Sequence, residues 1–317
     1  MQRRKFLQTA GILTAATLAG CTPTAEKNTI STSPATAAAP EGDLWFDISL
    51  AQWSLNKAFF SGELDNLDFA KVARDTYGLG GIEYVNQFFP DKAGDQAYLG
   101  QLKQRAEDNG VRSLLIMVDR EGSLGATDET ERTAAVENHY KWVDAAKYLG
   151  CHSIRVNAAG EGTREEVAAA ATDGLARLSE YGQQAGLNII VENHGSYSSD
   201  GKWLSDVIAA TGMDNCGTLP DFGNFCIQRT ADGCADEYDR YKGVKEMMPY
   251  AKAVSAKTHD FDPDGTETHT DYQRMLKIVK DAGYRGWVGI EYEGSSMTPE
   301  AGIRATIELL RRAGSMV

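Results

Sequence analysis

The chain has 317 residues, of which 45 are acidic and 32 are basic, and its formal net charge is −13. Such a charge repels phosphate backbones and no basic cluster interrupts it, so nucleic acid is excluded as an expected partner. Without the N-terminal segment described next, about 270 residues remain, which suits one (β/α)₈ barrel with a large core.

The first 21 residues have the pattern of an export signal. Arg3 and Arg4 precede an apolar stretch, residues 10–19, that is too short to span a bilayer. This order predicts a twin-arginine signal peptide. The segment ends in Leu-Ala-Gly-Cys, which resembles a bacterial lipobox, so Cys21 is expected to be lipidated. A plain cleaved signal with an incidental cysteine is the alternative.

Residues 22–43 are rich in Thr, Ala, Ser and Pro and lack periodicity, which predicts a flexible tether. We therefore expect an exported, periplasmic lipoprotein whose only membrane contact is its N-terminal lipid anchor. The fold is expected to occupy residues 44–317.

In chain order, eight short apolar or β-branched runs alternate with segments of helical periodicity. The predicted strands are Trp45–Trp53, Gly81–Val85, Ser113–Val118, Ser153–Val156, Asn188–Val191, Gly217–Leu219, Ala253–Thr258 and Trp287–Ile290. Predicted crossover helices include Glu63–Tyr77, Thr130–Tyr148, Arg164–Gln184 and Tyr272–Asp281. Several of them end in a glycine that supplies a left-handed cap before the next strand, as at Gly150 and Gly186.

This alternation indicates a parallel sheet, so the predicted fold is α/β, a single (β/α)₈ TIM barrel over residues 44–317. A doubly wound sheet is the competing architecture. It is disfavoured because no Gly-x-Gly-x-x-Gly follows the first predicted strand.

Four cysteines follow the signal. Cys151 and Cys216 stand at the starts of predicted strands, where we expect small buried hydrophobic residues. Cys226 and Cys234 lie close together in one loop, and the expected compartment permits disulfides. They either form a bridge or stay free, since sequence spacing alone does not fix their geometry.

Residues able to bind a divalent metal stand at four strand ends in the second half of the chain. They are Glu192, Asp221, His259 and Glu291. The C-terminal ends of barrel strands meet at one face, so these side chains are expected to converge. Carboxylates with one imidazole suit Mn²⁺, Mg²⁺, Co²⁺ or Zn²⁺. The sequence therefore predicts one divalent metal ion in a metal-dependent enzyme.

Three motifs around these residues resemble one known family. They are Val191-Glu192-Asn193-His194, Pro220-Asp221-Phe222-Gly223-Asn224 and Ile290-Glu291-Tyr292-Glu293. The chain is similar over residues 44–313 to the sugar phosphate isomerase/epimerase family, the xylose isomerase-like TIM barrels. The resemblance implies Glu192, Asp221, His259 and Glu291 as metal ligands, Mn²⁺ as the preferred ion, and a second role for Glu192 and Glu291 as the acid/base pair.

The resemblance leaves the register of His259 open. The family often has His-x-Lys-Asp or His-x-His at this strand, whereas this chain reads Ser255-Ala256-Lys257-Thr258-His259. If Lys257 matches the family lysine, Ser255 takes the ligand position, and His259 becomes a supporting or substrate-binding group. We predict His259 as the ligand because no other histidine is available there.

Six further residues are candidates for substrate binding. They are His194, Asn224, Arg155, Glu83, Lys257 and Trp53. His194 lies two positions after Glu192 and is expected to face the pocket or else a surface loop, because a strand turns alternate residues the same way. Arg155 and Glu83 contact substrate hydroxyls by the resemblance, or form structural ion pairs instead. Trp53 either stacks on a sugar or packs in the barrel.

The leading functional hypothesis is a metal-dependent isomerase or epimerase of an unphosphorylated sugar. Abstraction of a proton beside a carbonyl, through an enediolate, needs a base, an acid and charge stabilisation. A 3-keto-glycoside lyase that uses the same metal and glutamates for β-elimination is the alternative. A carbohydrate-binding lipoprotein without catalysis is a third. A DNA endonuclease on a related barrel is disfavoured because it needs several histidine ligands, and this chain has five histidines in all.

Overall fold

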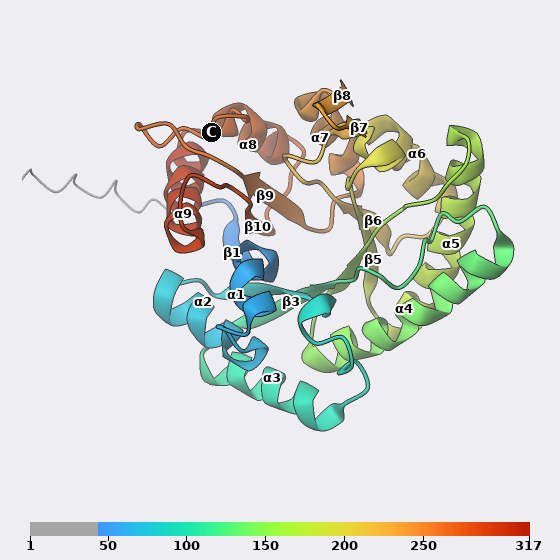
Figure 1. Cartoon of the computed structure of the whole chain (residues 1–317), viewed down its shortest axis with the longest axis horizontal. Coiled ribbons are helices and arrows are strands. Elements are labelled where there is room, and N and C mark those ends of the chain that lie inside the picture. The colour runs from blue at the N-terminus through green and yellow to red at the C-terminus, as the bar shows by residue number, and fades with distance from the viewer. Residues whose placement is uncertain (1–43) are drawn as a thin grey trace, which may run out of the picture. The chain divides into compact units, whose positions relative to one another are not determined.

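The computed structural model describes residues 44–317 (Figure 1). The predicted signal peptide, Cys21 and the tether at residues 22–43 lie outside this range. No helix within the described range is long and apolar enough to cross a membrane.

Eight parallel strands form one curled sheet in the order β6-β5-β4-β3-β2-β1-β10-β9. The bounds are β1 Asp47–Ala51, β2 Gly81–Val85, β3 Arg112–Met117, β4 Ser153–Val156, β5 Asn188–Glu192, β6 Cys216–Leu219, β9 Val254–Thr258 and β10 Trp287–Tyr292. The two edge strands meet only at isolated parallel bridges, which join Thr218 to Ala251 and Asp221 to Ser255. The barrel is thus closed most weakly between β6 and β9, and Asp221 is one of the few residues that join them.

Helices follow the strands and surround the sheet (Figure 1). Their bounds are α1 Asn56–Ser61, α2 Phe69–Tyr77, α3 Gln96–Asp108, α4 Glu129–Leu149, α5 Arg164–Ala185, α6 Gly201–Thr211, α7 Arg240–Met247, α8 Tyr272–Asp281 and α9 Pro299–Ser315. Short 3₁₀ turns occupy η1 Gln52–Leu55, η2 Asn66–Asp68, η3 Asn86–Phe88, η4 Ser196–Ser199 and η5 Met248–Tyr250. The predicted TIM barrel is therefore confirmed.

Local sequence explains where the longest helices begin and end. The Asp128 side chain accepts a hydrogen bond from the main-chain N of Glu131 at the start of α4, and Thr163 forms a capping box with Glu166 at the start of α5. Gly150 and Gly186 end these helices with φ of 79° and 76°, the left-handed conformation that glycine adopts without a Cβ clash. The predicted helix-glycine-strand junctions are confirmed at both positions.

Two apolar clusters support the site. The larger lies between the sheet and the helices and includes Trp142, Leu175 and Ile290. The smaller fills the inside of the barrel, with Leu115, Met117, Ile190 and Leu219 among its members. Ile190 and Glu192 are two residues apart on β5 and therefore point to the same side of the strand. The functional side chains thus stand on top of a packed apolar floor.

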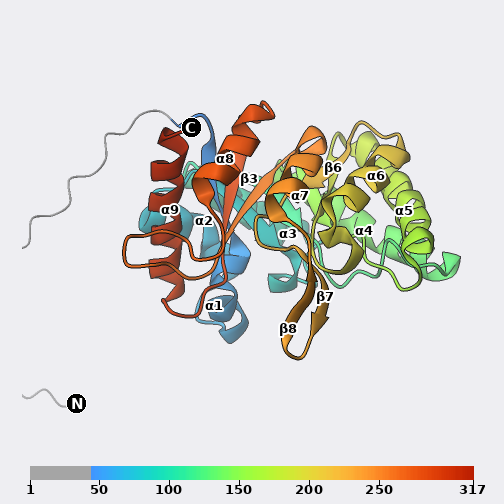
Figure 2. The ribbon, with the colours of Figure 1, turned by 90° about the horizontal axis from the view of Figure 1, so that it is seen from above.

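An antiparallel hairpin after β6 was not predicted. Its strands are β7 Cys226–Thr230 and β8 Gly233–Glu237, and it projects from the side of the barrel on which α1 lies (Figure 2). Its side chains are largely exposed, so it lacks the apolar pattern that marks the barrel strands. Cys226 and Cys234 form a disulfide across it, whereas Cys151 and Cys216 are free and buried.

We expect the Cys226→Ser/Cys234→Ser variant to be cleaved by trypsin at Arg229 at least about tenfold faster than the wild type. The disulfide closes a short loop and so stabilises the closed hairpin by roughly 2–3 kcal/mol relative to the open one. Few apolar contacts would hold the hairpin closed without it. Limited proteolysis with mass spectrometry measures the rate, and reductant-treated wild type is the matched control. An unchanged cleavage rate would mean that the hairpin is held by its other contacts.

Candidate active site

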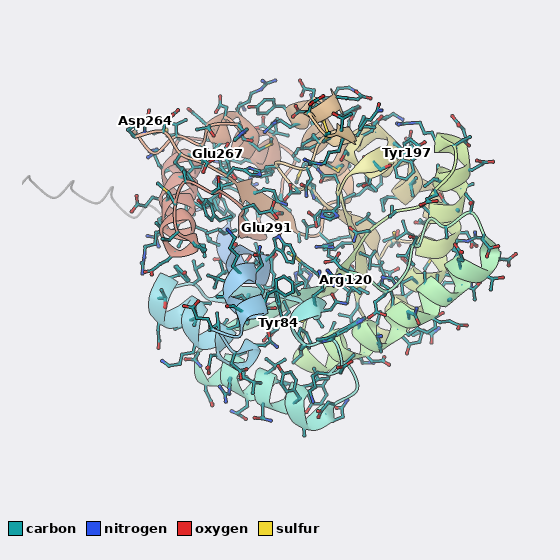
Figure 3. The ribbon with its side chains drawn as sticks, in the orientation of Figure 1. Tyr84, Arg120, Tyr197, Asp264, Glu267 and Glu291 are labelled. Atoms are coloured by element: carbon teal, nitrogen blue, oxygen red, sulfur yellow. A yellow bond between two sulfur atoms is a disulfide. The ribbon has the colours of Figure 1, made fainter. Side chains whose placement is uncertain are left out.

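Three acidic side chains from different strands converge inside the barrel. Glu192 ends β5, Asp221 follows β6 and Glu291 lies on β10, and all three are buried. One carboxylate oxygen from each lies within 4.8 Å of the others. Figure 3 shows Glu291 in the middle of the ring of strands. Three of the four residues predicted as metal ligands are therefore brought together.

Asp221 is held rigidly at the point where the barrel closes. Its main-chain N donates to Asn193 Oδ1 (2.7 Å), and Asn193 Nδ2 donates back to the Asp221 carbonyl (3.0 Å). Oδ1 accepts hydrogen bonds from the main-chain N of Gly223 and of Asn224, both at 2.9 Å. Oδ2 accepts one from Ser255 Oγ (2.7 Å). Few orientations remain open to this carboxylate.

Glu192 is positioned by two residues predicted to bind substrate. Asn224 Nδ2 donates to Glu192 Oε1 (2.8 Å), and Arg155 Nε lies 2.8 Å from Glu192 Oε2. The Nε–H bond of Arg155 does not point at Glu192 Oε2, so neither of these two atoms has a hydrogen-bond partner. Arg155 Nη1 also donates to Asp119 Oδ1 (2.8 Å), which Asn157 Nδ2 contacts at 2.9 Å. Arg155 therefore bridges two carboxylates.

Lys257 points into the same group of acids. Its side chain is 3 % exposed, and its Nζ lies 2.8 Å from Glu291 Oε1, 3.3 Å from Glu293 Oε2 and 3.9 Å from Asp221 Oδ2. Asn224 Oδ1 lies 3.4 Å from the same nitrogen. Residue 257 thus brings a positive charge to the place where the sequence predicted a metal and its ligands.

Burial and charge shift the protonation of these groups. Burial raises the pKa of Glu291 and of Asp221 above the ordinary range, and Glu192 adds to the rise while Lys257 opposes it. Burial lowers the pKa of Lys257, but Asp221 and Glu291 outweigh burial and hold that pKa well above its usual value. Lys257 is therefore an ammonium at neutral pH.

His259 lies in a different group. It follows the end of β9, and together with Glu267 and His269 it forms a second set whose ligand atoms lie within 4.8 Å of one another. Figure 3 shows Glu267 displaced from Glu291 toward α8 and α9. Side chains alternate along a strand, so Ser255 and Lys257 take the inward positions on β9 and His259 falls in the following loop. The structure does not bring His259 to the three carboxylates.

Trp53 and His194 lie outside the group of carboxylates. Trp53 Nε1 donates to Glu293 Oε1 (2.5 Å), and the Trp53 ring stacks on Phe88 with centroids 6.2 Å apart. Trp53, His259 and Glu293 line a cavity of about 260 Å³. His194 is exposed at the end of β5. Trp53 therefore packs against Phe88 and borders a cavity, and its stacking on a sugar stays a prediction.

Glu83 lies on β2 with its carboxylate fully buried. Ser49 Oγ donates to its Oε1 (2.6 Å), while Oε2 has no partner. Gly289 makes room for it, because a Cβ at that position would lie 2.3 Å from Oε1. Burial raises the pKa of Glu83 from 4.5 to about 7, and the Ser49 hydrogen bond opposes the rise.

The raised pKa of Glu83 predicts a pH-dependent stability. The folded protein binds the proton more tightly than the unfolded chain, so this contribution is complete below pH 4.5 and disappears as the pH rises through about 7. Relative to Glu83→Gln, the wild type should lose up to about 3 kcal/mol of unfolding free energy over that interval. Urea unfolding of both proteins at several pH values measures the difference. Parallel pH profiles would contradict the prediction.

The three carboxylates fit a divalent metal ion. Glu192 Oε2 and Glu291 Oε2 are buried and have no hydrogen-bond partner, although buried polar atoms normally have one. Glu291 Oε2 is therefore available as a ligand, whereas Glu192 Oε2 also lies 2.8 Å from the Arg155 Nε. Carboxylate oxygens are donors that Mg²⁺ and Mn²⁺ prefer. The imidazole expected from the sequence is not part of this donor set.

Sequence reasoning missed Asp119 and Glu293, and it considered Ser255 only as a ligand in the alternative register. Asp119 follows β3 and pairs with Arg155, Glu293 pairs with Lys257, and Ser255 donates to Asp221. Glu293 lies two residues after Glu291, and the same period of two that singled out His194 would have found it. Asp119 lies beyond the apolar run of its strand, where nothing in the sequence distinguishes it from a loop aspartate.

The comparisons with known proteins agree with this fold. The family model described as xylose isomerase-like TIM barrel matches residues 70–313. No curated protein sequence matches the chain significantly.

Many solved structures share the fold. A xylose isomerase domain protein from Planctomyces limnophilus superposes with a TM-score of 0.63 at 13 % identity, covering 87 % of this chain and 99 % of that one. For 3-keto-D-glucoside 4-epimerase from E. coli the TM-score is 0.60 at 14 % identity, with 85 % and 99 % covered. A xylose isomerase-like TIM barrel protein from Mycobacterium smegmatis in complex with magnesium gives 0.59 at 16 %, with 78 % and 89 % covered.

Proposed function

Because the chain belongs to the family of xylose isomerase-like TIM barrels, we propose that it is a sugar isomerase or epimerase that moves a proton on a carbon beside a carbonyl group. The proposal rests on two buried glutamates, Glu192 on β5 and Glu291 on β10, whose carboxylates lie close together in the group that also contains Asp221. Two carboxylates are the minimum for taking a proton from one face of a carbon and returning one to the other.

The two glutamates have different surroundings, which suits different roles. Glu291 has the raised pKa of a group that can hold and donate a proton near neutral pH. Asn224 and Arg155 orient Glu192. A carboxylate that accepts a proton from one direction needs such a fixed orientation. In the reverse reaction the roles exchange, since an epimerisation passes through the same groups in both directions.

We propose one divalent metal ion, with Mn²⁺ preferred, as the cofactor, held by Glu192, Asp221 and Glu291. Such an ion supplies Lewis-acid stabilisation of the negative charge that develops on a substrate oxygen. Hydrogen bonds with Asn193 and Ser255 fix the orientation of Asp221. The similarity to a barrel solved with magnesium supports a metal at this kind of site.

We propose an unphosphorylated sugar or keto-glycoside as the substrate. Both cations among the carboxylates, Arg155 and Lys257, are already paired with acids, and Asp119 and Glu293 add further negative charge. A phosphate group would meet net repulsion there. Export through the twin-arginine signal proposed for residues 1–21 is consistent with such a substrate, since sugar phosphates are made in the cytoplasm.

A 3-keto-glycoside lyase is the second candidate, favoured by the structural likeness to a 3-keto-D-glucoside epimerase. Loss of the C2 proton beside a C3 ketone expels the C1 substituent with its bonding electrons, and a donated proton neutralises the leaving alcohol. Purified protein with Mn²⁺ is incubated in D₂O with a free ketose and, separately, with a 3-keto-glucoside. Deuterium at the carbon beside the carbonyl of the ketose supports the isomerase, whereas aglycone release from the glucoside alone would replace it with the lyase.

A further inference from the structure

Lys257 is in contact with two of the carboxylates that would hold the proposed metal ion. Its Nζ lies 2.8 Å from Glu291 Oε1 and 3.9 Å from Asp221 Oδ2, and both carboxylates belong to the proposed ligand set. The side chain is 3 % exposed, so water screens its charge only weakly. An ammonium at these distances repels a divalent ion that is held by the same two carboxylates.

β9 therefore contributes to the site in an unexpected way. Its two inward residues are Ser255, whose hydroxyl donates to Asp221, and Lys257. Neither offers a nitrogen lone pair to a metal ion, as an imidazole ligand would. In place of a fourth ligand, this strand adds a positive charge.

The surroundings of Lys257 also contain a second resting place. Glu293 Oε2 lies 3.3 Å and Asn224 Oδ1 lies 3.4 Å from its Nζ, and neither residue is one of the proposed ligands. Glu293 is partly exposed, with 32 % of its side chain accessible, so it lies at the outer edge of the group. A small movement of the flexible lysine side chain would keep these two contacts while releasing Glu291 and Asp221.

We propose that Lys257 is a tethered competitor of the divalent ion: its ammonium holds Asp221 and Glu291 when no metal is bound, and metal loading displaces it toward Glu293 and Asn224. The inference rests on the proposed function, because it assumes that the three carboxylates are the metal site. Its consequence is a metal affinity far below that of an unopposed set of three buried carboxylates. The lysine also keeps the acids compensated while the metal is absent, which limits the cost of their burial.

The test is the affinity for Mn²⁺ of the folded protein without sugar, measured by isothermal titration after removal of metal with a chelator. Lys257→Met keeps the length of the side chain and removes its charge. We expect it to bind Mn²⁺ about tenfold or more tightly than the wild type, since a repelling charge beside the ion is gone. Lys277→Met, which removes an exposed lysine of α8, is the matched control and should leave the affinity unchanged.

A gain of affinity cannot come from a damaged fold, which is why the direction of the change decides the question. Unchanged or weaker binding in Lys257→Met would overturn the proposal and leave the lysine as a group that orients the carboxylates or binds substrate. If Lys257→Met does not fold, Glu293→Gln tests the same idea from the other side. That variant removes the second resting place and should weaken Mn²⁺ binding; an unchanged affinity would contradict the displacement.

This experiment separates the inference from the proposed function. Stoichiometric Mn²⁺ binding that is equal in wild type and Lys257→Met refutes the competition but leaves the metal-dependent isomerase in place. Absence of Mn²⁺ binding from both proteins removes the metal site itself, and with it the basis of both proposals.

Discussion

Glu291→Gln and Glu192→Gln are each expected to lower kcat for sugar interconversion by about 10²–10⁴-fold, the usual contribution of a positioned acid or base. Glutamine keeps the size of the side chain and an oxygen that can still act as a weak ligand, but it can neither take up nor release a proton. The rates are compared at saturating Mn²⁺, so that a weakened metal site is not mistaken for lost proton transfer.

The two variants should also differ from each other in D₂O. If each glutamate serves one face of the reacting carbon, each epimer loses its proton to a different residue. Glu291→Gln should then still exchange deuterium into one epimer, and Glu192→Gln into the other, although neither variant interconverts the two sugars. Mass spectrometry and NMR of the recovered sugars measure this exchange.

Glu300→Gln, which changes an exposed glutamate at the start of α9, is the control and should behave as the wild type. Exchange into both epimers by both variants would show that a different group moves the proton. In that case Glu192 and Glu291 would act as ligands alone. An unchanged kcat in either variant would exclude that residue from the chemistry.

Most of the barrel could be predicted because its signals are local. β2 and β4 have the predicted bounds, and α8 begins and ends at the predicted residues. Buried parallel strands are continuous apolar runs and crossover helices have clear periodicity, so neither depends on distant contacts. The β7–β8 hairpin lacks both signals, because its strands are exposed and are joined by the Cys226–Cys234 bridge.

The site could be predicted in part, for a similar reason. Glu192 and Glu291 stand on strands whose ends are marked by apolar runs, so their convergence followed from the fold. His259 lies beyond Thr258, where β9 ends, and a shift of two residues separates an inward ligand from a loop residue. The sequence was compatible with either His259 or Ser255 at the ligand position, and only the structure shows that Ser255 and Lys257 face the carboxylates. The Arg155–Asp119 pair joins side chains 36 residues apart and could not be inferred from spacing.

Arg155→Met is expected to destabilise the protein by about 3–5 kcal/mol, the largest effect of any single substitution considered for stability. The Arg155 guanidinium is buried and lies 2.8 Å from both Asp119 and Glu192. Burial alone would raise the pKa of Asp119, yet Arg155 holds it at about 2. Without the arginine, the buried carboxylate of Glu192 and the largely buried carboxylate of Asp119 lose the positive charge that lies between them.

Urea unfolding of metal-free protein at pH 7 measures the loss, and Arg105→Met is the matched control. Arg105 pairs with Asp68 at 2.6 Å, but both side chains are about half exposed, so that variant should lose about 1 kcal/mol or less. The wild-type pair stabilises the fold above the unfolded pKa of Asp119, near 3.8, and this contribution is lost as the pH falls through about 2. The deficit of Arg155→Met should therefore shrink as the pH is lowered from 7 toward 3.

The result also decides between the two roles considered for Arg155. A residue that contacts only substrate hydroxyls would leave the stability of the sugar-free protein unchanged and would raise KM when removed. Removal of a residue that compensates the charge of nearby acids must lower the stability of the protein even when no ligand is bound. A deficit no larger than that of Arg105→Met would refute the structural pairing and return Arg155 to substrate binding.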